Sequence, residues 1–525
     1  MRDKRSTVRR MLLAAGVMSA LATTAHAQAT PDPRDAEIQE LKAEVRALAA
    51  KLDRLEARAN TPPVIETPAA PGASASAQPA AIASIAGGRP SIASADGQFT
   101  ANLHAVVHLD AADYSQPSAG PVNTDFRRGA AATDTAHARD LSSGTDFRRA
   151  RLGVDGRAFG DWDYNLTFEF GGAGEEDAGH IYEAWIQYSG LKPFHARIGA
   201  FTPSAGLEDQ GSVNGMLFIE RPAVADIARS LAGGETREAA EIWAGTDRWY
   251  ANTAVTGRPV GIVNSQATGV SQPFDSQLGF IGRVGLTPFK TDRGLLALGL
   301  HGSYVDRPAD IGGPDAAAGA ARYGIILQER PELRVDGTRL ISTGSINARH
   351  ADTLGIEAAG QFGGLFLQGE YERIKIERLN AAAGASDPDF HGYYLEGSYI
   401  VTGEKRRFNP SIWAFDGPAV NRPFSLKSGT WGALEVAVRY SDVDLNYHAG
   451  AAGTAPSADA VRGGEQVIWT GGVNWYPNSF VRFMLDYQDV TILRLSPSAT
   501  SFLTPVGAQV GQHYHVVAVR SQFAF

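Results

Sequence analysis

The sequence predicts an all-β fold, a transmembrane antiparallel β-barrel of about 16 strands that is preceded by a short coiled-coil helix. Segments of about ten residues alternate apolar and polar side chains over most of the chain, as tilted membrane strands do. The connections between these segments alternate between short turns and long polar loops. Beyond the first 27 residues no apolar run is long enough for a transmembrane helix, so only a closed barrel would pair every backbone group within a bilayer.

The first 27 residues are predicted to be a cleaved secretory signal. Met1 to Arg10 carries five basic side chains, an apolar stretch runs from Met11 to about Ala22, and Ala25-His26-Ala27 is a small-x-small cleavage pattern. The alternative is a membrane-spanning helix, which would need a longer apolar stretch. We therefore expect export and a mature chain that begins near Gln28.

Charge and cysteine content narrow the class of protein. The signal holds five of the 48 basic and one of the 57 acidic side chains, which leaves the mature chain with a net charge of −13. That balance argues against a nucleic-acid-binding surface, so no nucleic-acid partner is expected. The chain has no cysteine, which excludes disulfides, thiolate metal sites and a lipid anchor on an N-terminal cysteine.

A coiled-coil segment is predicted within residues 28–60, and a flexible linker over residues 61–96. Apolar residues in the first segment recur at alternating spacings of three and four, which is the a/d heptad pattern. So short a helix is marginal alone, and we therefore favour an oligomer-forming coil over an amphipathic helix lying on another surface. The linker is rich in Ala, Pro, Ser and Gly and cannot bury a core. The heptad positions are Ile38, Leu41, Val45, Leu48, Leu52 and Leu55.

Residues 97–525 are predicted to form the barrel. In Trp162–Phe170 the odd-numbered positions are polar, whereas the even-numbered positions are aromatic or leucine. Successive side chains of a strand point to opposite faces, so this pattern gives one apolar and one polar face. Similar segments are Phe99–Asp110, Leu278–Leu286, Leu296–Tyr304, Leu354–Phe362, Leu365–Arg373, Tyr393–Tyr399, Gly432–Tyr440, Val467–Trp475 and Val481–Tyr487, with a weaker pair at 237–245 and 249–257.

The connections and the chain end favour an outer-membrane barrel over a soluble β-sandwich or propeller. Phe159-Gly160-Asp161 and Gly363-Gly364 are short turns, whereas 204–236 and 306–350 are long loops. The last residue of the sequence is the aromatic Phe525, and the sequence contains no repeat of the length of a propeller blade. Aromatic residues at strand ends suit the girdles of a membrane barrel, namely Trp162, Tyr188, Trp249, Tyr304, Tyr399, Trp431, Tyr440, Trp475, Tyr476 and Tyr487.

Residues 97–525 resemble the phosphate-selective porins O and P. The resemblance implies an outer-membrane trimer of a Gram-negative bacterium with sixteen strands per subunit. It also implies a third extracellular loop folded into each pore, and a preference for anions. The five ordered stretches that carry it are Asp146–Leu152 (DFRRARL), Phe218–Arg221 (FIER) after the fifth strand, Thr402-Gly403-Glu404 with Arg406 after the tenth, Gly432–Ser441 (GALEVAVRYS) and Gly472–Tyr476 (GVNWY).

Arginines are the predicted pore-lining residues. A guanidinium group stays charged and offers a planar fork of donors to phosphate. Arg148, Arg149 and Arg151 are the strongest candidates because they lie in a family-like stretch, while Arg221 matches the loop-three motif and would equally hold that loop against Glu208 or Glu220. The remaining candidates from strand alternation and loop three are Arg157, Arg197, Arg229, Arg237, Arg283, Arg439, Arg482 and Arg520.

Carboxylates on the same strand faces oppose this prediction. Alternation also turns Asp155, Glu183, Glu357, Glu370, Glu396, Glu435 and Asp486 inward, so the two sets of charges would partly neutralise each other. We therefore expect passive diffusion of small anions, with phosphate or phosphorylated solutes implied by the resemblance. The alternatives are a weakly selective or sugar-conducting pore, or a structural or binding barrel. Outer-membrane lipid and lipopolysaccharide would surround it.

No enzymatic activity and no cofactor is predicted. The sequence contains no Walker loop, no His-Glu-x-x-His motif and no Gly-x-Ser-x-Gly motif. His104 and His108 share a strand face, but they lie too far apart along the strand for one metal ion, so no metal site is expected there.

Overall fold

A computed structural model describes residues 81–116, 141–172, 179–233, 236–260, 275–310, 322–496 and 506–525. The predicted signal, the coiled-coil segment and most of the linker lie outside these residues. Within them, no helix has the length and apolar character needed to cross a membrane.

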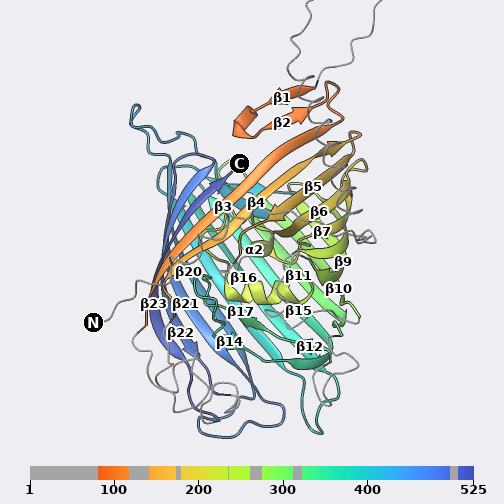
Figure 1. Ribbon diagram of the computed structural model, residues 1–525, viewed down its shortest axis with the longest axis vertical. Helices are drawn as coiled ribbons and strands as arrows, with labels where there is room; N and C mark the ends of the chain where they lie inside the picture. The colour runs from red at the N-terminus through yellow and green to blue at the C-terminus, as the bar shows by residue number, and fades with distance from the viewer. Residues whose placement is uncertain are drawn as a thin grey trace, which may run out of the picture. The chain divides into compact units, whose positions relative to one another are not determined.

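The described chain forms a closed barrel of sixteen antiparallel strands, which confirms the predicted β-barrel of about 16 strands (Figure 1). Each strand pairs with the next, and the last closes on the first through pairs from His515↔Ser115 to Ala524↔Val106. The weaker pair in the sequence forms two regular strands, β8 and β9. The strands are β3 (Thr100–Ser115), β4 (Gly144–Ala158), β5 (Trp162–Glu169), β6 (His180–Tyr188), β7 (Phe194–Phe201), β8 (Arg237–Gly245), β9 (Trp249–Pro259), β10 (Leu278–Lys290), β11 (Gly294–Arg307), β15 (Ile346–Phe362), β16 (Leu365–Arg378), β17 (Asp389–Ile400), β20 (Ala433–Tyr447), β21 (Val461–Tyr476), β22 (Val481–Leu493) and β23 (Gln512–Ala524).

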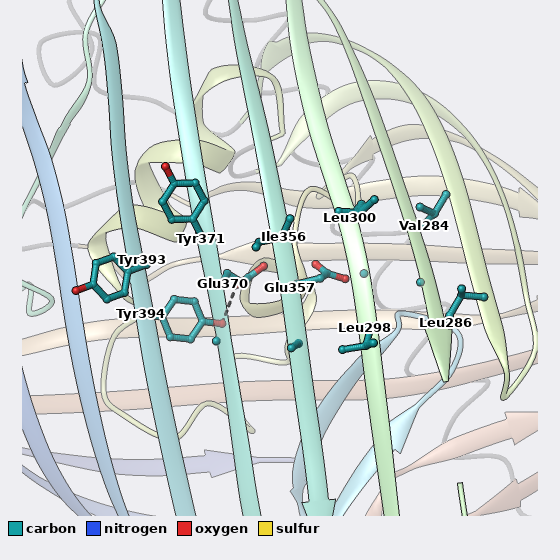
Figure 2. Close-up of a pocket in the computed structure, with 14 residues that line it drawn as sticks. Val284, Leu286, Leu298, Leu300, Ile356, Glu357, Glu370, Tyr371, Tyr393 and Tyr394 are labelled. Carbon is teal, nitrogen blue, oxygen red and sulfur yellow. Dashed lines mark hydrogen bonds between the residues drawn. The ribbon is translucent and has the colours of Figure 1, made fainter. Parts of the chain in front are cut away.

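The barrel wall is apolar outside and polar inside. In β16, Leu367 and Tyr371 are 50% and 40% exposed on the outer face, whereas Glu370 and Glu372 on the inner face are buried. Such an outer surface is stable only in contact with lipid. A hollow of about 720 Å³ in the wall of β10, β11 and β15 to β17 is lined mainly by leucines, tyrosines and small residues of the outer face, together with Glu357, Glu370 and Tyr394 of the inner face (Figure 2).

The predicted girdle aromatics lie mostly on the outer face. Trp162 and Trp431 lie near the short-turn end, Tyr304 lies near the long-loop end and Tyr487 lies at the middle of β22, and all four are exposed. Tyr476 instead points inward, where its hydroxyl donates to Glu435 at 2.8 Å. The inward position follows from strand alternation, because the neighbouring Trp475 takes the outer face.

Short turns join the strands at one end of the barrel, with one exception. Gly363-Gly364 is a two-residue turn in which Gly363 has a φ of 59°, a conformation that favours glycine. The exception is the connection 401–432, which contains a hairpin of β18 (Arg406–Asn409) and β19 (Ala414–Pro418). We call Arg406–Pro418 the inner hairpin. The stretch Thr402–Glu404 precedes this hairpin. It follows the twelfth strand, β17, and not the tenth strand as predicted, because β8 and β9 are complete strands.

The end of the predicted linker is ordered. β1 (Ile82–Ser84) and β2 (Ser91–Ala93) form a hairpin around the short helix η1 (Ala86–Gly88), and β2 pairs with the start of β3. Arg89 holds the hairpin against the barrel by pairing with Asp155 of β4. A flexible linker over the whole of 61–96 is therefore wrong for residues 82–93, since β2 extends the pairing of β3.

Two long loops fold into the barrel. Loop three, residues 202–236, contains α2 (Leu207–Gln210) and α3 (Ala223–Ala232), drawn yellow-green across the barrel in Figure 1. Pro222 precedes α3 and Gly233 ends it. Loop five, residues 308–345, carries β12 (Gly324–Ile325), β13 (Gln328–Glu329) and β14 (Ile341–Ser342). Apolar residues of α3 and loop five pack together against the barrel wall in one core, among them Ile227, Leu231, Leu333 and Ile374.

Candidate functional site

Arginines of the barrel wall hold loop three in the lumen. Arg439 donates to the carbonyl oxygen of Glu220 at 3.0 Å, and Arg482 donates to that of Met216 at 2.6 Å. Arg520 donates to the carbonyl oxygen of Ile219 at 2.5 Å. All three side chains are 1% exposed. A charged donor to a backbone carbonyl is a strong hydrogen bond, so these arginines anchor the constriction.

Four guanidinium groups converge on the carboxylate of Glu220. The distances are 2.7 Å from Arg148, 2.9 Å from Arg520, 3.7 Å from Arg334 and 3.8 Å from Arg149. Burial by itself raises the pKa of Glu220, but the guanidinium groups of Arg148, Arg149 and Arg520 outweigh it and hold the pKa well below its usual range. Asp110 pairs with Arg520 and Asp226 pairs with Arg334, and Asp146 lies close enough to Arg148 and Arg520 to interact with their charges.

A β-bulge brings Arg148 and Arg149 to the same side of the wall. In the backbone register of β3 and β4, His108 lies opposite Arg149 and Asp110 lies opposite Asp146. Phe147 and Arg148 of β4 therefore lie together opposite the single residue Leu109 of β3. A bulge re-aims one side chain, which lets Arg148 reach Glu220 although strict alternation would turn it outward. Sequence alternation alone could not place this residue.

Arg149 and Arg151 complete this cluster. Arg149 lies 3.2 Å from Nδ1 of His108, and its Nε has no hydrogen-bond partner among the described residues. Arg151 pairs with Glu169 at 2.6 Å and lies 3.5 Å from the centre of the Tyr182 ring. We call Arg148, Arg149, Arg151, Arg334 and Arg520 the arginine cluster.

The arginines of loop three hold the loop together. Arg221 donates to the carbonyl oxygens of Glu208, Asp209 and Gly211 at 3.0 to 3.3 Å. Of the two roles open for Arg221 in the sequence, its contacts thus favour holding the loop. Arg229 pairs with Asp226 at 2.8 Å and with Asp209 at 3.1 Å. Arg237, the first residue of β8, donates to the carbonyl oxygen of Ser230 in the loop at 2.7 Å.

Two predicted residues lie away from the cluster. Arg157 is half-exposed near the short-turn end, where it pairs with Asp163 at 3.2 Å. Arg197 donates to the side-chain oxygen of Gln187 at 3.0 Å and lies beside the Trp185 and Phe201 rings. Neither residue forms a hydrogen bond or ion pair with loop three in the described part of the chain, so the structure does not bring all twelve predicted arginines together.

The wall formed by β15 to β20 is acidic. Glu370 accepts hydrogen bonds from the backbone of Leu207 (2.6 Å) and Glu208 (3.0 Å), and so holds the start of α2. Gln368 donates to both Glu208 (2.6 Å) and Glu396 (2.7 Å). A carboxylate at a helix N-terminus is favourable, but these groups also place negative charge beside the constriction.

The inner hairpin narrows the lumen from the short-turn end. Arg283 pairs with Glu357 at 2.9 Å and donates to the carbonyl oxygens of Ile412 (3.0 Å) and Trp413 (2.8 Å). Trp413 is 0% exposed and packs between Tyr250 and Phe408. The sequence alone predicted no role for the hairpin. A signal was present in the aromatic residues Phe408, Trp413 and Phe415, which lie within a connection that is long for this end of a barrel.

Comparison with known proteins decides the family. The model of the family described as "Phosphate-selective porin O and P" matches residues 120–525. The chain belongs to this family. Members are channels of the bacterial outer membrane and not enzymes, in agreement with the localisation and the absence of catalysis expected from the sequence.

Individual relatives of this porin are distant. Porin O of Pseudomonas aeruginosa is 25% identical over 348 residues, which cover 65% of this chain and 75% of that protein. An uncharacterised protein of Caulobacter vibrioides is 25% identical over 92% of this chain and 91% of its own. Among solved structures, the anion-selective porin from Comamonas acidovorans is similar with a TM-score of 0.44 and 14% identity, covering 81% of this chain and all of that one.

Proposed function

We propose that this porin conducts small anions by passive diffusion, with phosphate or phosphorylated compounds as its solutes. The convergence of four arginines on Glu220 carries the proposal, because it gathers four cations of β4, β23 and loop five beside loop three. An anion entering the constriction would exchange partners along the arginine cluster, which favours passage without tight binding. Arg148, Arg151 and Arg334 would make the first contacts, since their side chains are 11 to 15% exposed, whereas that of Arg149 is 3% exposed.

A weakly selective pore is the second candidate, and the acidic wall favours it. Glu357, Glu370, Glu396 and Glu435 lie on β15 to β20, whereas the arginine cluster lies mainly on β4, β23 and the two inner loops. Rows of opposite charge on different parts of the wall produce an electric field across the pore. They do not by themselves make the pore prefer anions to cations. Arg283 and Arg406 each pair with one of these carboxylates, at 2.9 and 2.8 Å, which reduces the acidic excess.

We predict that the reconstituted porin prefers chloride to potassium and that phosphate reduces its chloride current. The measurement is the reversal potential across a KCl gradient in a planar bilayer, followed by titration with phosphate. The double variant Arg149→Gln, Arg151→Gln is expected to lower the anion preference and to weaken the phosphate block at least about tenfold, because each lost charge-assisted contact costs about 1.4 kcal/mol or more.

The matched control for this prediction is Arg157→Gln. Arg157 lies on the same strand, but its side chain is half-exposed near the short-turn end and paired with Asp163. Its substitution is therefore expected to leave the phosphate block unchanged. A cation-selective wild-type pore would refute the anion proposal and favour the weakly selective one, and absence of any current would favour a structural barrel.

The proposed assembly is a homotrimer embedded in outer-membrane lipid and lipopolysaccharide. The family resemblance supports it, and the heptad pattern at Ile38–Leu55 would supply a parallel coil on the periplasmic side. Removal of residues 28–60 is expected to lower the proportion of trimer on chemical crosslinking in detergent. An unchanged proportion would assign that segment to a tethering role.

A further inference from the structure

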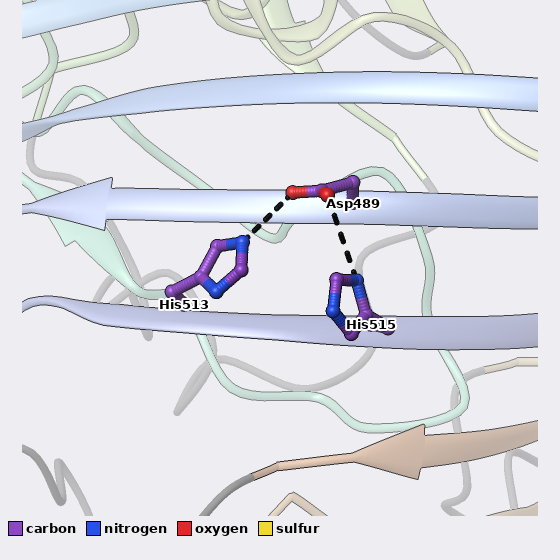
Figure 3. A group of neighbouring side chains, drawn as sticks. All are labelled: Asp489, His513 and His515. Carbon is purple, nitrogen blue, oxygen red and sulfur yellow. Dashed lines mark hydrogen bonds and ion pairs between the residues drawn. The ribbon is translucent and has the colours of Figure 1, made fainter.

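Three potential metal ligands gather on the outer face of the barrel, near the end that carries the long loops. Asp489 belongs to β22, and His513 and His515 belong to β23 (Figure 3). In the register of the sheet His515 lies directly opposite Asp489, and His513 lies opposite Thr491. All three side chains are thus on one face, within the reach of directly opposed and diagonal neighbours.

The distances among the three side chains suit a transition-metal ion. Nε2 of His513 is 3.0 Å from one oxygen of Asp489, and Nδ1 of His515 is 3.6 Å from the other. All three ligand atoms lie within 4.8 Å of one another. Tetrahedral zinc with bonds of about 2.0 Å separates its ligands by about 3.3 Å, so small ring rotations would close the site.

Aromatic contacts hold the ring of His515 in place, but its Nδ1 atom makes no hydrogen bond within the described part of the chain. Tyr487 stacks on this ring at 5.8 Å, and the His513 ring meets it edge-on at 5.1 Å. Nδ1 of His515 is shielded from solvent and has no hydrogen-bond partner among the described residues. A shielded polar atom without a partner is costly, and a metal ion bound between Nδ1 and Asp489 would satisfy it.

The position on the barrel leaves these residues accessible. His513, His515 and Asp489 are 54%, 41% and 42% exposed. The outward Trp469 lies opposite Asp489 on the other side of β22, and aromatic residues of this kind mark the membrane–water interface. The cluster therefore lies at the level of the lipid headgroups rather than in the hydrocarbon, where two histidines and a carboxylate would be expensive.

We propose that Asp489, His513 and His515 form a binding site for a divalent transition-metal ion of the zinc class on the outer face of the porin. Imidazole and carboxylate ligands suit zinc, nickel and copper, whereas calcium and magnesium prefer oxygen ligands alone. Three protein ligands leave at least one coordination position for water at the membrane surface. This site is independent of the pore and of the solute that the pore conducts.

Zinc binding to the purified, folded full-length mature protein in detergent tests the proposal. After treatment with a chelator, the protein is titrated with zinc alone by calorimetry, and one ion per chain is expected. His513→Gln and His515→Gln are each expected to weaken binding at least about tenfold, because each removes one of three ligands. Cobalt in place of zinc is expected to give the intense visible absorption of a four-coordinate ion.

His448→Gln is the matched control. His448 is also exposed and pairs with a carboxylate, Asp459, at 2.8 Å, but this pair has no third ligand in the described residues. Its substitution is expected to leave zinc binding unchanged. The proposal is overturned if the wild-type protein binds no stoichiometric zinc, or if the double variant of His513 and His515 retains it. The cobalt spectrum tests the wild-type protein even if a variant does not fold.

Discussion

Replacement of Glu220 by glutamine is expected to destabilise the folded porin and to strengthen its preference for anions. Glu220 is buried and is the common partner of Arg148, Arg149, Arg334 and Arg520. Removal of one partner from a buried charge network leaves cations without compensation, at a cost of about 3–5 kcal/mol. The backbone anchors from Arg439, Arg482 and Arg520 remain, so loop three is expected to stay in the lumen.

The change in selectivity follows from the lost charge. For an anion that passes about 8 Å away in water-like surroundings, one unit charge contributes about 0.5 kcal/mol, or a change of about twofold in permeability. The reversal potential across a KCl gradient should therefore shift toward the chloride potential, while thermal unfolding should begin at a lower temperature. An unchanged reversal potential would show that the arginine cluster does not face the path of the ions.

The pH dependence of the Glu220→Gln effect provides a second measurement. Since arginines hold the pKa of Glu220 well below that of an unfolded glutamate, about 4.3, its stabilisation is present above that value and is lost as the pH falls through the folded pKa. The difference in unfolding temperature between wild type and variant is thus expected to be constant from about pH 7 to pH 4.5. It should disappear only at lower pH.

Glu238→Gln is the matched control for both measurements. Glu238 pairs with Arg258 at 3.0 Å, but both side chains are more than half-exposed. An exposed ion pair contributes at most about 1 kcal/mol, so this variant should behave as wild type. If both variants lose the same stability, a general sensitivity to charge would replace the network around Glu220 as the explanation.

Local pattern was enough to predict the barrel but not the contents of its lumen. Strand alternation placed Arg283, Arg439 and Arg520 on the inner face because the side-chain period of a strand is two. It could not show that these arginines donate to loop backbone, since their partners are distant in sequence: Arg520 and Ile219 are 301 positions apart. Such contacts depend on how a loop packs in three dimensions, which no local spacing records.

Two departures from regular alternation explain what else escaped prediction. The bulge at Phe147 and Arg148 is a register shift between strands, and it is visible only when both strands are paired. The inner hairpin lies at the end of the barrel where the other connections are short turns, and the role of its aromatic residues is visible only once the barrel is closed. Both features lie at the constriction, where a regular barrel is modified to shape the pore.

Replacement of Trp413 by alanine is expected to release the inner hairpin and to raise the single-channel conductance. Trp413 is fully buried between Tyr250 and Phe408, and truncation of a buried tryptophan costs about 3–5 kcal/mol of packing. The two hydrogen bonds from Arg283 to the hairpin backbone contribute about 1.5 kcal/mol or more each. They do so only while the hairpin keeps its geometry, and that geometry depends on the packing of Trp413.

Gly285→Val separates release of the hairpin from simple removal of an obstruction. A Cβ at Gly285 would lie 2.0 Å from Nε1 of Trp413, so valine must displace the indole while it adds atoms to the lumen. If Trp413 merely filled space, this variant would lower the conductance; if it holds the hairpin in place, both variants should raise it. Trp431→Ala, which removes an exposed indole on the outer face near the same end, should leave the conductance unchanged. A rise in all three would instead indicate a general loosening of the barrel, because only the first two substitutions touch the contact between Trp413 and the wall.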